Sequence, residues 1–441
     1  MITTVDWLLT LILLVGGLIF LMAMGLPVAF CFMFVNLVGV YWFWGGLSGL
    51  EQLIHTIFES LSSFTLLPLP LFVLMGEVMF LSGIAPKMID ALDKWLGRIP
   101  GRLSLLAVGA GTIFSTLSGA SMASVAMLGS TLTPEMEKRG YKKPMSLGPI
   151  LGSGGLAIMI PPSVLAVLLG AIGRISVGKI LIAIIVPGLL MAALYTIYIV
   201  GRCMLQPAMA PAYDVKVPRF SERLLATAKY ILPLSLILFL VIGMMLIGVA
   251  TPSEAAALGV IGCFFLAFVY QRLTWDLVKN SIANTLKVTV MIFIIIAGAL
   301  AFAQILAFSG ASRGLIKFTL SLPLTPLLII VAMQIILLVL GTFMDVVAMM
   351  LITLPLYMPV IKALGFDPVW FAVIMLLNVE MADVSPPFGL GLFVMKGVAP
   401  KGTTMGDIYK AVLPFLACDL VAMIIIIFFP SIALWLPSLM R

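Results

Sequence analysis

The stretch MADVSPPFGLG, residues 381–391, interrupts a long apolar segment. It places a carboxylate, Asp383, and a hydroxyl, Ser385, directly before Pro386 and Pro387. Proline inside a helix removes a backbone hydrogen bond, and in lipid the freed backbone groups must be received by protein or by a water-filled cavity. The stretch therefore predicts a broken helix at membrane depth.

The composition predicts an all-α polytopic membrane protein. Hydrophobic residues make up 63% of the chain and charged residues 10%, whereas soluble domains contain about half and a quarter. At about 20 residues per span, we predict ten spans. They lie near 5–24, 26–47, 66–84, 145–171, 177–203, 228–249, 252–271, 288–309, 366–393 and 408–437.

Two further apolar stretches are long enough for two passes but break in the middle. Residues 104–133 break at STLSGAS (115–121), and residues 322–358 break at LGTFMD (340–345). Both predict re-entrant helical hairpins, because broken backbone survives in a membrane only against protein or water.

An internal repeat decides the predicted architecture. A shift of 225 residues superimposes PPSVLAVLLG (161–170) on PPFGLGLFVM (386–395), and places STLSGAS opposite LGTFMDV. We predict a first repeat at 1–205, a cytoplasmic linker at 206–225 and a second repeat at 226–441. Five spans per repeat is an odd number, so the repeats have opposite orientations, as in secondary transporters.

The distribution of Lys and Arg predicts the orientation. With both termini outside, nineteen of the 25 basic residues lie on the inner side, as the positive-inside rule requires. The six on the outer side are Arg174, Lys179, Arg313, Lys317, Lys362 and Arg441.

Three intervals have the pattern of amphipathic surface helices. Residues 50–64 and 274–288 lie about one repeat apart, and are either interfacial arms that brace the two halves or ordinary connecting helices. Residues 85–101 predict a similar helix on the inner surface.

The breaks carry the predicted chemistry. Exposed helix N-termini favour anions, and unwound carbonyls with hydroxyls favour Na⁺. We predict one oxygen-lined pocket per repeat, the second formed mostly by carbonyl groups. The first uses Ser115, Ser118, Ala157, Ile160 and Pro161, and the second uses Gly341, Thr342, Ala382, Ser385 and Phe388. The alternative is a pair of kinked helices whose serine hydroxyls bond back to the preceding turn.

Acidic side chains inside the membrane usually face a cavity or a partner, because charge there costs ~3 kcal/mol or more. Asp345 follows the second hairpin tip and Asp383 precedes the second Pro-Pro pair, so both converge on one end of the second pocket. They are candidate coupling acids that hold a cation or carry a proton, or else caps of half-helix N-termini.

Other chemistry finds little support in the sequence. The chain contains no CxxC, a single histidine and no GxxxxGK[ST] loop. Zinc binding, an enzyme active site and ATP-driven transport by this chain are therefore disfavoured.

At these residues the chain resembles the large membrane subunit of TRAP transporters, the tripartite ATP-independent periplasmic carriers. The resemblance rests on GTIFSTLSGASMASVAMLG (111–129), IPPS (160–163), ATPSEAAALG (250–259), GTFMD (341–345) and NVEMADVSPPFGLGLFV (378–394). It implies an elevator-type permease of the ion-transporter superfamily in the bacterial inner membrane. The inward Na⁺ gradient would drive uptake of small carboxylates, such as C4-dicarboxylates. The implied partners are a periplasmic substrate-binding protein and a small four-span membrane subunit.

The resemblance also implies site residues. One Na⁺ site falls on Ser115, Ser118, Ala157, Ile160 and Pro161, and the other on Gly341, Ala382, Ser385 and Phe388. The substrate region is expected at the hairpin tips, at Ser118, Gly119, Ser121 and Thr342.

The chain departs from the family pattern at a few of these positions. Glycine is common in the family at the positions of Ala157 and Ala382, threonine is common at Ser385, and an acid at Asp383 is unusual. Two alternatives stay open: a stand-alone Na⁺- or H⁺-coupled carboxylate symporter of the same superfamily, and an ion channel.

Overall fold

The computed structural model describes residues 7–118, 121–213 and 218–440, with all of their side chains except those of residues 85 and 115–118. This part of the chain is helical and contains no strand. The helices up to the linker are α1 Trp7–Leu11, α2 Gly17–Ala23, α3 Val28–Phe43, α4 Leu47–Leu61, α5 Pro68–Leu81, α6 Ala85–Asp93, α7 Arg102–Ser118, α8 Ser121–Lys138, α9 Lys143–Met159, α10 Val164–Gly173, α11 Val177–Ala183 and α12 Ile185–Leu205.

The later helices are α13 Phe220–Ala226, α14 Leu232–Leu246, α15 Pro252–Val269, α16 Trp275–Phe308, α17 Ala311–Ser321, α18 Pro326–Gly341, α19 Val346–Ala363, α20 Pro368–Asp383, α21 Leu390–Val398, α22 Met405–Phe428 and α23 Ser431–Ser438. Short π-helical turns join α1 to α2 (Ile12–Gly16) and α13 to α14 (Thr227–Ile231). Single 3₁₀ turns lie at Phe64–Leu66 and Pro207–Met209.

Seven of the described helical segments are long and apolar enough to cross a membrane, or eight if the bent pair α9–α10 counts as one span. One of the seven is α19, which the sequence assigned to a hairpin. Four of the ten predicted spans fall short as single helices, namely 5–24, 26–47, 366–393 and 145–171, the last of which is the bent pair α9–α10. At 1.5 Å per residue, the 16-residue α3 reaches only about 24 Å, because Pro27 precedes it and Gly45 follows it closely.

The helices break where the sequence predicts. The helices α18 and α19 separate at the expected hairpin tip, and α9 and α20 end just before their Pro-Pro pairs. The first expected tip, between α7 and α8, includes residues 119 and 120, which lie outside the described residues. The peptide bonds Pro161–Pro162 and Pro386–Pro387 are both cis. The grouping of these elements into two inverted repeats stays a prediction.

Three element boundaries differ from the expectation. The amphipathic interval 274–288 is not a separate surface helix, because it continues into the next span as the 34-residue α16. No proline interrupts α16 between the amphipathic interval and the span. The counterpart interval 50–64 behaves differently, because α4 ends there and a new helix, α5, begins with Pro68 and Pro70. The last predicted span, 408–437, divides at Pro430, and α13 begins at Phe220, inside the predicted linker.

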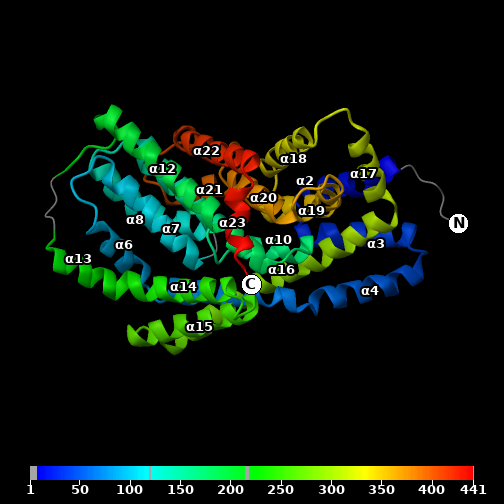
Figure 1. Cartoon of the computed structure of the whole chain (residues 1–441), viewed down its shortest axis with the longest axis horizontal. Coiled ribbons are helices and arrows are strands. Elements are labelled where there is room, and N and C mark those ends of the chain that lie inside the picture. The colour runs from blue at the N-terminus through cyan, green and yellow to red at the C-terminus, as the bar shows by residue number, and fades with distance from the viewer. Residues whose placement is uncertain (1–6, 119–120, 214–217, 441) are drawn as a thin grey trace.

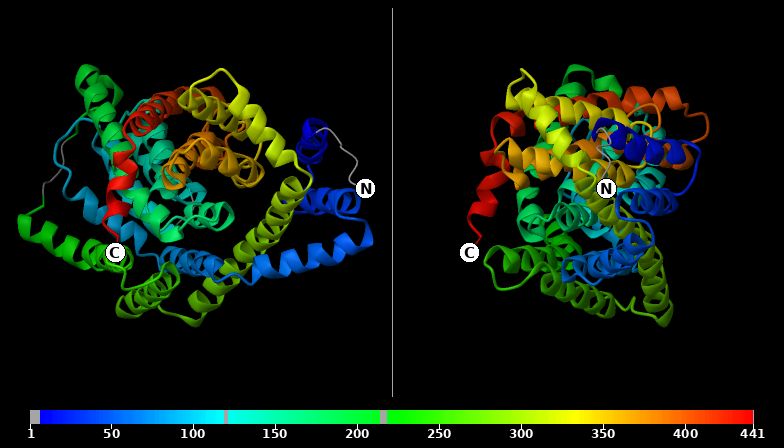
Figure 2. Two further views of the ribbon diagram at one scale, coloured as in Figure 1. Left: turned by 45° about the vertical axis from the view of Figure 1, so that its right-hand side comes forward. Right: turned by 90° about the vertical axis from the view of Figure 1, so that its right-hand side faces the viewer.

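The two broken helices lie in the core. Every residue of α9 from Met145 to Met159 and of α20 from Val369 to Asp383 is buried. Figure 1 places α20 and α10 in the middle of the molecule, with α13–α15 and α4 along its lower edge. In the left view of Figure 2, the long α16 runs diagonally between the central orange helices and the blue helices of the N-terminal part. Protein therefore surrounds the interrupted backbone, as a break in lipid requires.

Candidate functional site

The tip of the second hairpin packs directly against the end of α20. Gly341 closes α18, and a Cβ atom built on it would overlap the Cβ of Ala382 and lie 2.9 Å from the Met349 sulfur. Only glycine leaves room for this contact. The structure thus brings together two residues that the sequence assigned to one pocket.

Ser385 and Phe388 follow in the turn that leaves α20. The Ser385 hydroxyl is buried and donates a 2.7 Å hydrogen bond to the Met381 carbonyl oxygen. This is the bond to the preceding turn that the alternative interpretation expected, although the hydroxyl oxygen keeps its lone pairs as acceptors. Phe388 is 55% exposed, and its ring centroid lies 6.0 Å from that of Phe343 at the hairpin tip.

The first break is only partly described. Ala157, Ile160 and Pro161 are buried around the end of α9, and Gly188 of α12 packs closely against Ile160. The side chains of Ser115 and Ser118, and the whole of Gly119, lie outside the described residues. The first predicted pocket therefore stays a prediction.

The two candidate coupling acids have different surroundings. Asp345 caps α19, because its carboxylate accepts hydrogen bonds from the backbone N–H groups of Val347 (3.0 Å) and Ala348 (3.1 Å). Asp383 instead accepts a 2.7 Å hydrogen bond from the hydroxyl of Ser121, the first residue of α8. Its carboxylate is 1% exposed, and its Oδ1 atom has no partner.

The Ser121–Asp383 bond joins the first hairpin to the second Pro-Pro break. The sequence had placed Asp383 in the second pocket and Ser121 at the opposite hairpin tip, without connecting them. Thr342, at the other tip, is exposed at its hydroxyl and donates to the Val339 carbonyl oxygen. The two hydroxyl groups therefore differ in their partners: Ser121 bonds the distant Asp383, whereas Thr342 bonds the preceding turn of its own helix.

One turn away lies a buried cluster in which sequence reasoning noted Glu380 as an intramembrane acid but missed Asp419 and Tyr195. The Tyr195 hydroxyl forms a hydrogen bond with Asp419 and lies 3.3 Å from Glu380 Oε1, and all three residues are buried. One oxygen of each carboxylate has no partner. Asp419 stands inside the apolar run FLACDLVAM (415–423), which is the signal that could have found it.

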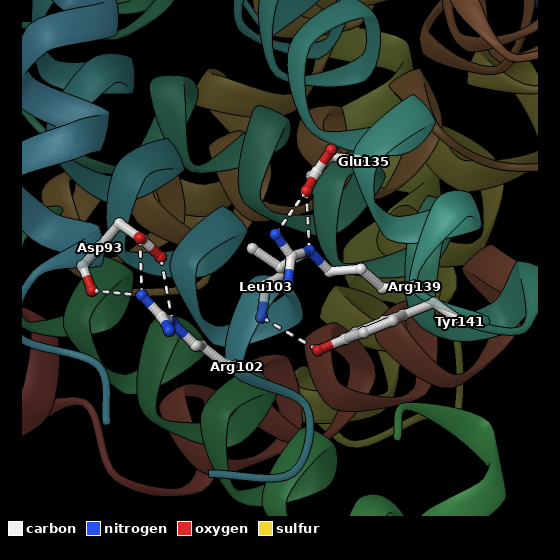
Figure 3. Close-up of polar contacts among 6 residues, drawn as sticks. All are labelled: Asp93, Arg102, Leu103, Glu135, Arg139 and Tyr141. Carbon is white, nitrogen blue, oxygen red and sulfur yellow. Dashed lines mark hydrogen bonds and ion pairs between the residues drawn. The ribbon is translucent and has the colours of Figure 1, made fainter. Parts of the chain in front are cut away.

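The base of the first hairpin is tied together by charged and aromatic groups (Figure 3). Arg102 forms a two-pronged ion pair with Asp93, with a shortest distance of 2.6 Å, and Arg139 pairs with Glu135 at 2.6 Å. The Tyr141 hydroxyl accepts a hydrogen bond from the Leu103 backbone (3.3 Å), and burial raises the pKa of Tyr141 to about 12.

The linker after α12 lies against this base. The Arg139 guanidinium stands 3.8 Å from the centre of the Tyr213 ring, within the range of a cation–π contact. The Lys142 backbone N–H donates to the Met209 carbonyl oxygen (2.9 Å). The base of the hairpin is thus held against residues that come about 70 positions later in the chain.

Comparisons with known proteins bear on this site. The family described as "Tripartite ATP-independent periplasmic transporter, DctM component" matches residues 15–432. A relative from Pseudomonas aeruginosa, "C4-dicarboxylate TRAP transporter large permease protein DctM", is 36% identical over 386 residues, which cover 87% of this chain and 88% of the relative.

A second relative is longer than this chain. The "Isethionate TRAP transporter permease protein DctMQ" of Oleidesulfovibrio alaskensis is 29% identical, and the match covers 88% of this chain but 60% of that protein. Among solved structures, the YdaH transporter of Alcanivorax borkumensis aligns with a TM-score of 0.62 at 15% identity, covering 87% of this chain and 90% of that one. That likeness shows the fold alone.

Proposed function

This chain belongs to the DctM family of large permease subunits of TRAP transporters, and on that premise we propose a specific transport function. It imports small carboxylates across the bacterial inner membrane, driven by the inward Na⁺ gradient and supplied by a periplasmic binding protein. Both termini face outward, and the core helices around the breaks move as the transport part of an elevator against a scaffold.

The observation that carries the proposal is the meeting of hairpin tips and broken helices. Gly341 at one tip packs on Ala382, and Ser121 at the other tip bonds Asp383. Backbone that is interrupted at membrane depth and lines a site is typical of secondary transporters. An ion channel would instead need a continuous polar pore.

The second break suits a small cation. The last carbonyl groups of a helix have no intrahelical donor, and the buried Oδ1 of Asp383 has no partner. Carbonyl oxygens of Gly341, Ala382 and Phe388, with the Ser385 hydroxyl, would hold Na⁺ here, and oxygen ligands are the kind that hard cations prefer.

The relatives support the proposed partners and substrate class. The DctMQ protein extends well beyond the region matched by this chain, and we assign the missing part to a separate small subunit of four spans. The named substrates of the two relatives reported above, C4-dicarboxylates and isethionate, are anions. We propose a C4-dicarboxylate, because the Pseudomonas relative has the higher identity.

Reconstitution in liposomes tests this function. The full chain and its small membrane subunit are incorporated together, and the uptake of radiolabelled succinate is measured with and without the binding protein, under an inward gradient of Na⁺ or of choline. We expect uptake only with Na⁺ and the binding protein together. Equal uptake without the binding protein, in liposomes that contain this chain alone, would establish the stand-alone symporter, and equal uptake in choline would remove Na⁺ coupling. Single-channel currents would favour the channel.

A further inference from the structure

A cavity of about 1110 Å³ separates the two groups of helices on one side of the molecule. One wall consists of the end of α4, the end of α16 and the start of α17, and the other consists of α10 and α19. Figure 1 shows these helices together in its right-hand half. Among the residues that the structure describes, neither Pro-Pro pair nor the tip of the second hairpin lines the cavity, so it is distinct from the second helix break.

Basic groups dominate the lining. Arg174, Arg313 and Lys362 reach the cavity, and Glu59 is the single acidic residue among the described residues that line it. Arg174 ends α10, Lys362 lies in the last turn of α19, and Arg313 lies in the first turn of α17. Among the residues that the structure describes, none of these four forms an ion pair, so the lining keeps two uncompensated positive charges.

The location of these cations is unexpected. The positive-inside rule leaves only six basic residues for the outer side of the membrane, and three of the six meet at this one cavity. They come from three different helices and from both walls. An anion between the walls would therefore face cations from both groups of helices.

We propose that this outer cavity binds a small dicarboxylate on its way from the outer side to the helix breaks. The inference rests on the proposed function, which it deepens by adding an entry site. Cavities lined by one sign of charge with apolar walls concentrate counter-ions from solution. Leu354, Met358 and Leu300 supply such walls here. The volume is slightly above the usual range of small-molecule sites, so a molecule of succinate size fits together with bound water.

The positive potential can be measured without transport. Ser312→Cys places a thiol in the lining beside Arg313, and Ser321→Cys places one at the exposed end of the same helix, outside the cavity. In the full chain with its small subunit in nanodiscs, and without binding protein, we measure the reaction of each thiol with anionic and cationic methanethiosulfonates. The parent chain gives the background of the native cysteines, three of which are buried.

We expect the cysteine at 312 to prefer the anionic reagent over the cationic one by about tenfold relative to the cysteine at 321. Millimolar succinate should slow its modification, and the neutral analogue succinamide should not. The double substitution Arg174→Gln/Lys362→Gln should abolish both effects, whereas Lys179→Gln/Lys317→Gln removes two outer charges away from the cavity and should preserve them.

Several results would overturn the inference. These are an equal reagent preference at the two cysteines, no protection by succinate, equal protection by succinamide, or equal loss in the two double variants. Each of them leaves the Na⁺-driven uptake assay unaffected, so a failure of the entry site is distinguishable from a failure of the proposed function. If Arg174→Gln/Lys362→Gln does not fold, the two single substitutions are compared, with Lys362→Arg as the variant that retains the charge.

Discussion

Replacing Gly341 by alanine tests the contact on which the second site depends. The added methyl group would overlap Ala382 and lie 2.9 Å from the Met349 sulfur, so the hairpin tip must move away from α20. Overpacking of this kind costs about 1–3 kcal/mol. If Na⁺ binding requires the packed tip, that cost weakens apparent Na⁺ affinity by about 5- to 150-fold, since 1.4 kcal/mol is a factor of ten.

The assay is the Na⁺ dependence of succinate uptake in liposomes that contain the complete transporter. Gly109→Ala is the matched control, because it lies in an arm of the first hairpin and a Cβ atom there meets nothing within 4 Å. It should leave the half-saturating Na⁺ concentration unchanged. The reasoning fails if folded Gly341→Ala protein keeps a half-saturating concentration within about twofold of the parent.

Three further substitutions address the polar groups around the breaks. Ser121→Ala removes the donor to the buried Asp383 carboxylate, and should destabilise the protein by about 1.5–3 kcal/mol. Thermal unfolding measures this loss of stability. A loss just as large in the Asp383→Asn background would contradict a direct bond between the two side chains. Asp345→Ala removes two capping bonds and should lower the stability of the protein by about 0.5–2 kcal/mol, whereas Asp345→Asn keeps the cap. Equal transport defects in both variants would show that the charge of Asp345, and not its capping bonds, is what transport requires. Ser385→Ala should weaken the Na⁺ response by about fivefold, or about 1 kcal/mol, with Ser385→Thr as the matched control; an unchanged response would limit this hydroxyl to its bond with Met381.

The helix breaks were predictable from the sequence because proline and glycine act locally. Pro386 and Pro387 end α20 whatever surrounds them, and the same holds for the pair at the end of α9. Contacts between side chains far apart in the chain carry no such signal. The bond between Ser121 and Asp383 spans 262 positions, and neither residue by itself indicates the other.

Helix lengths were the less certain part of the prediction. No proline interrupts residues 274–309, although the sequence pattern changes within them from amphipathic to fully apolar. The structure makes this interval one helix, α16, because no residue in it breaks backbone hydrogen bonding. Pro430, in contrast, ends α22 within a run that hydropathy alone treats as a single span.

The sequence by itself determined that this protein is a helical membrane protein and where its helices are interrupted, since hydropathy and proline act over short distances. Only the tertiary structure decided which interruptions meet, that Asp345 caps α19 while Asp383 bonds the opposite hairpin, and that Glu380 and Asp419 share Tyr195. These pairings depend on how buried helices pack, and burial makes each polar group take whichever partner the packing brings within reach.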